Sequence, residues 1–66
     1  MAFTWDDENE IADALVIAHP DIDPMELSFP KLHALITELP GFADDPDQSD
    51  EGKLEAIQMA WYDRIG

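Results

Sequence analysis

The sequence predicts an all-α fold, a small three-helix domain with little or no sheet. Apolar residues recur at helical spacing in three segments, and two acidic, proline-containing connections separate these segments. The chain has 66 residues, of which 45% are hydrophobic. A chain of this length buries about 60% of its unfolded surface, which is enough for one core. We therefore expect residues 1–66 to form a single domain.

The first helix is expected from Trp5 to Ala18. Thr4 is its predicted N-cap, and Asp7 is the capping-box partner three residues further on. The acidic first turn suits the positive end of the helix dipole. His19-Pro20 ends the helix, because the residue before a proline avoids helical geometry. The predicted buried stripe consists of Ile11, Ala12, Leu15 and Ala18.

The rest of the chain predicts one short turn and two more helices. Asp23 followed by Pro24 is typical of the start of a single helical turn. The second helix is expected from Pro30 to Leu39, closed by Pro40-Gly41. Ser49 is the predicted cap of the third helix. The apolar stripes of these two helices are Leu32, Leu35, Ile36 and Leu39, then Leu54, Ile57, Trp61 and Ile65. The aromatic residues expected to anchor the helix contacts are Trp5, Phe29, Phe42 and Trp61.

Charge sets the expected partners. Sixteen acidic residues against three basic ones give a formal net charge of −13. Such a surface repels nucleic acid and anionic membranes and attracts basic protein surfaces and hard cations. The chain has no cysteine, which excludes disulfides and thiolate ligation within it. We find no apolar run long enough to span a bilayer and no signal peptide, so a cytoplasmic location is expected, and like charge favours a monomer.

The acidic residues fall into two clusters, each open to two interpretations. The N-terminal cluster either stabilises a helix start as part of a solvated face, or forms a docking patch for a basic surface. The second cluster is either a capped helix start with a polar loop, or a weak site for ferrous, magnesium or manganese ions. It fails as an EF-hand, because Pro46 and Gln48 occupy ligand positions and Ser49 replaces the required glycine. The clusters are Asp6, Asp7, Glu8, Glu10 and Asp13, then Asp44, Asp45, Asp47, Asp50, Glu51 and Glu55.

Catalytic motifs are not found in the chain. His33 is expected to be a half-buried structural residue, and neither histidine has the spacing of a closed transition-metal site. Ser28 and Ser49 stand at expected helix starts, where capping explains them. We therefore expect no enzymatic activity.

An ordered set of residues runs along almost the whole chain. The set is Trp5, Asp7, Glu10-Ile11-Ala12, Ala14-Leu15, Pro20-Asp21, Asp23-Pro24, Phe29, His33, Ile36, Leu39, Phe42, Asp44-Asp45-Pro46, Ser49, Glu51, Leu54-Glu55-Ala56-Ile57 and Trp61. This set resembles the IscX (YfhJ) family, small acidic proteins of bacterial iron–sulfur cluster assembly. Asp50 departs from the asparagine expected at that position, and Pro30 is a second departure.

The resemblance implies a modified winged-helix fold with a reduced wing. It also implies binding to the cysteine desulfurase of the assembly machinery and weak binding of ferrous iron through surface carboxylates, with no tightly bound cofactor. A winged helix often binds DNA, but a charge of −13 opposes contact with phosphates. The expected role is an iron-dependent regulator or adaptor, and the alternative is a dedicated iron carrier.

Candidate site residues follow from the two clusters together with the resemblance. The expected partner contacts are Asp6, Asp7, Glu8, Glu10, Asp44, Asp45, Asp47, Glu51 and Glu55. The expected weak metal ligands are Asp44, Asp45, Asp47, Glu51 and Glu55.

Overall fold

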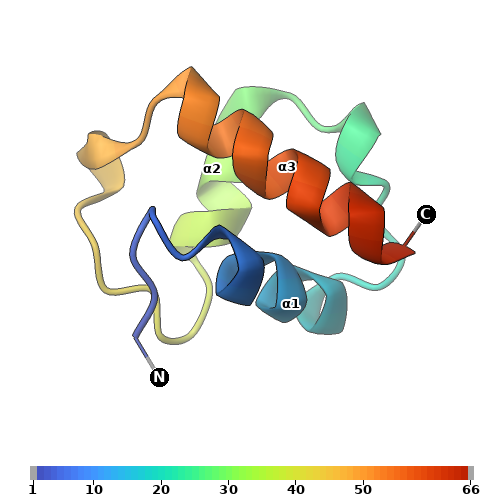
Figure 1. Ribbon diagram of the computed structural model, residues 1–66, viewed down its shortest axis with the longest axis horizontal. Coiled ribbons are helices and arrows are strands. Elements are labelled where there is room, and N and C mark those ends of the chain that lie inside the picture. Colours follow the sequence, from blue (N-terminus) through green and yellow to red (C-terminus); the bar gives the residue numbers. More distant parts are fainter. Residues whose placement is uncertain (1, 66) are drawn as a thin grey trace.

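The computed structural model describes residues 2–65 and contains three α-helices (Figure 1). They are α1 (Glu8–Ala18), α2 (Phe29–Thr37) and α3 (Glu51–Ile65), with two 3₁₀ turns, η1 (Pro24–Glu26) and η2 (Pro46–Gln48). Within the described residues there is no strand, and one isolated parallel bridge pairs Phe3 with Phe42. The predicted all-α, three-helix domain is therefore confirmed, while its winged-helix relationship stays a prediction.

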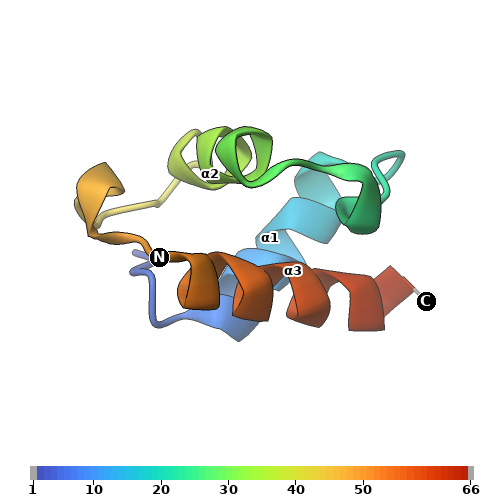
Figure 2. The same cartoon turned by 90° about the horizontal axis from the view of Figure 1, so that it is seen from above.

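Helix α1 packs mainly against α3, and α2 completes the core. In Figure 1, α1 and α3 run in the same general direction, and in Figure 2 α2 and α3 lie on opposite sides of the view while α1 crosses behind α3 toward the level of α2. None of the helices within residues 2–65 is long and apolar enough to cross a membrane.

The core forms where the three apolar stripes meet. The predicted stripes are buried except at two positions, Ala18 and Ile65, which are exposed. Both predictions were wrong, and both residues are the last of their helices, α1 and α3. The buried apolar residues are Trp5, Ile11, Ala12, Leu15, Leu32, Leu35, Ile36, Leu39, Leu54, Ile57 and Trp61.

The start of α1 differs from the prediction. The helix begins at Glu8, three residues after Trp5, and its N-cap residue is Asp7, so the assignment of the cap to Thr4 was wrong, although the expected contact between Thr4 and Asp7 is made. The Asp7 carboxylate accepts hydrogen bonds from the Thr4 backbone N–H (2.9 Å) and hydroxyl (3.3 Å), and Asp7 N–H returns one to the Thr4 carbonyl (2.9 Å). These bonds close a turn ahead of the helix. Trp5 is held outside α1 because its own backbone N–H donates to Asp44 (3.1 Å).

The other helix ends follow cap chemistry with small shifts. Ser28 caps α2 through the Lys31 N–H (3.4 Å), so this helix begins at Phe29, and it ends at Thr37, before the expected Leu39. The cap of α3 is Asp50, which accepts from the Lys53 N–H (2.8 Å), so the assignment to Ser49 was wrong by one residue. Either side chain is a good N-cap, and the backbone path selects the second.

The predicted turn at residues 23–26 is confirmed as η1, where Asp23 accepts from the Met25 N–H (3.0 Å). The chain turns at the predicted Pro40-Gly41, where Gly41 has a φ of 95°, in the left-handed region that glycine adopts without strain, although α2 has already ended at Thr37.

Candidate functional site

The most acidic connection of the chain, residues 44–48, is tied to the core by Trp5. We call this segment the acidic loop. The buried indole of Trp5 donates from Nε1 to the Asp45 carbonyl (2.7 Å), and the Trp5 backbone N–H donates to the Asp44 carboxylate (3.1 Å). Buried indoles usually find a partner for this N–H, and here the partner lies 40 residues away in the sequence. The loop is therefore positioned by a rigid aromatic group.

His33 supplies a second anchor for the acidic loop. Its Nε2 lies 2.6 Å from the Pro46 carbonyl oxygen, so Nε2 carries the hydrogen in this contact. The imidazole stacks on Trp5 (ring centroids 5.5 Å apart), and Phe42 meets the same indole edge-on (4.9 Å). His33 is half-buried with a structural contact, as expected. In Figure 1 the loop with η2 lies at the edge of the molecule, outside the helices.

The first two carboxylates of the acidic loop are engaged by backbone donors. The Asp44 carboxylate accepts from the N–H groups of Trp5 and Asp45 (3.1 and 2.7 Å), and these bonds, that of Trp5 first, lower the pKa of Asp44 below its usual value. The Asp45 carboxylate accepts from the Asp47 N–H (2.9 Å). Both groups shape the loop while keeping their negative charge.

Apart from Asp50, which caps α3, the remaining residues of the second cluster are open to solvent. Asp47, Glu51 and Glu55 are all exposed. Across residues 2–65, no three Asp, Glu or His side chains gather into a metal-binding group. The metal ligands assigned from the sequence therefore stay a prediction, and binding there would require carboxylates to move together around the ion.

The N-terminal cluster is divided by two ion pairs. Asp6 pairs with Lys53 Nζ of α3 (2.6 Å), which raises the pKa of Lys53. Asp13 pairs with Arg64 near the end of α3, and Arg64 also donates to the Ala60 carbonyl (2.8 Å). Because both pairs are largely exposed, they orient α3 on the N-terminal segment and add little stability.

These contacts bring the two acidic clusters together at the start of α3. Trp5 bonds to the acidic loop, the adjacent Asp6 bonds to Lys53, and Lys53 N–H bonds to the Asp50 carboxylate. Two groups that are separated by about forty residues in the sequence thus form one surface. We call it the acidic face and define it as the residues that these contacts link, Asp6, Asp44, Asp45 and Asp50, with three neighbouring acids, Asp7 ahead of α1, Asp47 in η2 and Glu51 at the start of α3.

Three predicted contact residues lie outside this definition. Glu8 begins α1, and Glu55 lies one turn further along α3. Glu10 lines a separate hollow with Asp13 and Ile17. All of the predicted contact residues lie at exposed or half-buried positions. Their spacing along the sequence, however, held no information on which of them meet in the fold.

Gln58 has a structural role that the sequence reading missed. It is buried, and its side-chain amide donates to the Pro24 carbonyl (2.8 Å), which holds η1 against α3. Its place between Leu54 and Trp61 on the apolar stripe of α3 is the signal that could have revealed it, since a polar residue there needs a partner.

The fold and the site together define the class: a small all-helical domain with one carboxylate-rich surface. Residues 3–66 match the family model described as "Iron-sulphur cluster assembly", and the chain belongs to this family. It is also 44% identical over 63 residues to "Uncharacterized protein PA3808" of Pseudomonas aeruginosa, with 96% of each chain covered. Membership supports a role in iron–sulfur cluster assembly, the broader part of the expectation from sequence.

Proposed function

We propose that this protein is a non-enzymatic accessory protein of iron–sulfur cluster assembly, of the IscX type. It binds the cysteine desulfurase of the machinery through the acidic face, and it binds ferrous iron weakly. The bound iron changes the charge of the face, so the protein acts as an iron-dependent regulator or adaptor. It works as a cytoplasmic monomer with a modified winged-helix fold and uses neither nucleic acid nor a membrane as partner.

The observation that carries the proposal is the joining of two acidic clusters into one face in a chain of this family. Lys53 is the cation whose contacts join it, and it pairs with Asp6. A concentrated negative field steers a basic partner and raises the association rate, more strongly at low salt than at high salt. The anchors Trp5 and His33 hold the acidic loop in place before binding, which reduces the entropy lost on docking.

Weak iron binding is proposed for the exposed carboxylates at one edge of this face. Asp47 and Glu51 belong to the face, and Glu55 follows one turn later on α3. Oxygen ligands on mobile side chains suit a hard divalent ion that keeps several of its waters. If the desulfurase prefers the metal-free face, iron weakens its binding, and by reciprocity the desulfurase weakens iron binding by the same factor.

The test is calorimetric titration of the protein into the desulfurase of its own organism, at low and moderate salt, with and without ferrous iron. We expect binding that weakens steeply as salt rises and that shifts with iron. Absence of binding in every condition would remove the desulfurase from the proposal.

Charge variants test which carboxylates bind iron and the desulfurase. The triple variant Asp47→Asn, Glu51→Gln, Glu55→Gln should lose iron binding and weaken desulfurase binding, with its helicity intact. A matched control changes three exposed acids elsewhere by the same total charge: Asp21→Asn, Glu26→Gln, Glu38→Gln. Equal losses in the two variants would show that net charge acts without a defined face.

The same exposed carboxylates favour a second candidate, a dedicated iron carrier in which metal binding is the primary role. The triple variant separates the two functions. A carrier loses its iron but binds the desulfurase as before, whereas a regulated adaptor loses its iron and also binds the desulfurase more weakly.

A further inference from the structure

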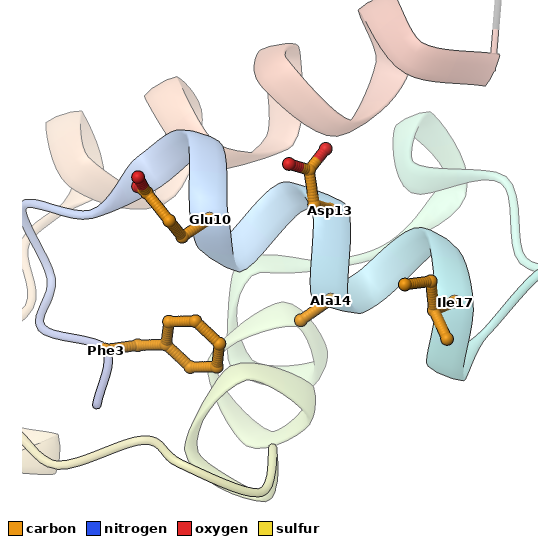
Figure 3. Close-up of a pocket in the computed structure, with 5 residues that line it drawn as sticks. All are labelled: Phe3, Glu10, Asp13, Ala14 and Ile17. Carbon is orange, nitrogen blue, oxygen red and sulfur yellow. The ribbon is translucent and has the colours of Figure 1, made fainter. Parts of the chain in front are cut away.

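A hollow on the outer side of α1 has no part in the acidic face. It has a volume of about 270 Å³ and is lined by Phe3, Glu10, Asp13, Ala14 and Ile17. Figure 3 shows the Phe3 ring and the Ala14 methyl group directed toward the same space, with Ile17 one turn further along α1. Ala14 and Ile17 lie beside the buried positions Ile11 and Leu15 but on another side of the helix.

One wall of the hollow is held by the backbone. Phe3 N–H donates to the Gly41 carbonyl (2.7 Å), and the Phe3 carbonyl accepts from the Ala43 N–H (2.8 Å). This parallel bridge fixes the Phe3 backbone against residues 41–43. The backbone that carries the Phe3 wall is therefore held in place before any partner binds.

Ile17 marks the hollow as a surface for a partner. This isoleucine is 81% exposed, the largest exposed fraction among the large exposed hydrophobic residues of the described chain. It contributes little to the core, and helix formation does not favour it over a polar residue. With the half-buried Phe3 and Ala14 it forms one continuous apolar lining, and continuous exposed apolar surface marks interaction sites more often than a single exposed residue does.

The charges at the rim select the occupant. Asp13 is already neutralised by Arg64, whereas Glu10 is exposed and makes no salt bridge within the described residues. A second copy of this chain is a poor occupant, since each copy carries a net charge of −13. The volume of about 270 Å³ exceeds the roughly 150 Å³ that holds a benzene-sized group but falls below the range of about 300–1,000 Å³ of ligand pockets.

We propose that this hollow is a docking site for a segment of a partner protein that presents one aliphatic or aromatic side chain next to an arginine or lysine. The apolar side chain enters between Phe3 and Ile17 above Ala14, and the neighbouring cation pairs with Glu10. The site adds selectivity for a partner with an apolar side chain, which the acidic face lacks. It is independent of the proposed binding to the desulfurase.

The test is an NMR titration of the isotope-labelled protein with two blocked pentapeptides, Gly-Arg-Leu-Arg-Gly and Gly-Arg-Gly-Arg-Gly. We expect the leucine peptide to shift the amides of Phe3, Ala14 and Ile17 more than the glycine peptide does. Ile17→Ser should weaken binding of the leucine peptide about fivefold, because part of an isoleucine burial is lost. The matched control Met59→Ser, at a residue 43% exposed on α3, should leave it unchanged.

Glu10→Gln should also weaken binding of the leucine peptide. Glu26→Gln, an equal charge change on η1, should weaken this binding less. The proposal is overturned if both peptides shift the same amides equally, if Ile17→Ser changes nothing, or if the shifts centre on the acidic loop or on Met59. Because the desulfurase is absent from this experiment, each of these outcomes leaves the proposed function standing.

Discussion

The two tryptophans offer a direct comparison of a paired and an unpaired buried indole. Trp5 is 3% exposed and donates from Nε1 to the Asp45 carbonyl, whereas Trp61 is 0% exposed and its Nε1 has no hydrogen-bond partner among residues 2–65. Replacing either residue by phenylalanine removes the same atoms from a buried place. The difference between the two variants therefore reports on the hydrogen bond.

The expected difference can be worked out from these contacts. Trp5→Phe loses a hydrogen bond with a net value of about 0.5–1.5 kcal/mol. Trp61→Phe removes a buried unpaired donor, whose desolvation costs about 1–3 kcal/mol. The loss in one variant and the relief in the other add, so we expect Trp5→Phe to lower the free energy of unfolding by about 1.5–4.5 kcal/mol more than Trp61→Phe does. The whole domain has a stability on the order of 3–10 kcal/mol, so this difference is easily measured.

The assay is urea unfolding of both variants, followed by far-UV circular dichroism. In thermal unfolding the same difference lowers the Tm of Trp5→Phe by about 4–8 °C per kcal/mol relative to Trp61→Phe. Amide hydrogen exchange adds a local reading, because residues 44–48 should lose protection only in Trp5→Phe. Equal destabilisation, or a larger loss in Trp61→Phe, would refute the role of Trp5 as the anchor of the acidic loop.

Three further predictions follow from the charges and from one buried amide. The pKa of Asp44 is lowered by hydrogen bonds from the N–H of Trp5 and then of Asp45, so the stability that the Asp44 carboxylate contributes is present above the usual carboxylate pKa and is lost as the pH falls through the lowered pKa. The NMR shift of the Trp5 amide, followed from neutral to acid pH, should record this loss. Gln58→Met should lower the free energy of unfolding by about 1–3 kcal/mol in urea, because the Pro24 carbonyl loses its donor, and an unchanged midpoint would contradict this. Added sodium chloride should raise the Tm, and magnesium chloride should raise it more at equal ionic strength, because both salts reduce the self-repulsion of a protein with a net charge of −13. A Tm that falls as salt is added would show that the loss of the ion pairs outweighs this effect.

Local sequence patterns predicted the helices well and their first residues less well. The apolar spacing and the stops at His19-Pro20 and Pro40-Gly41 carry enough information for three helices. The errors lie where two residues compete for one role. Ser49 and Asp50 are both suitable caps, and the choice depends on how the preceding loop reaches α3.

The candidate site was predictable in composition but not in arrangement. Clusters of acidic residues can be recognised along the sequence, and all of their members are exposed or half-buried in the structure. The bond from Trp5 to Asp45 spans 40 residues and depends on the packing of α2 against the loop, which no local period encodes. The joining of the two clusters is therefore a property of the tertiary structure.

The short bridge between Phe3 and Phe42 makes the chain unequally sensitive to proteolysis at its two ends. Cleavage between Thr4 and Trp5 would remove the Phe3 wall of the hollow and the two backbone bonds to Gly41 and Ala43. A cut of similar size before Arg64 would remove exposed residues of the last turn of α3 and the ion pair between Arg64 and Asp13, but none of the apolar lining of the hollow. Labels and affinity tags for binding studies therefore belong after α3, where they leave the Phe3 wall of the hollow in place.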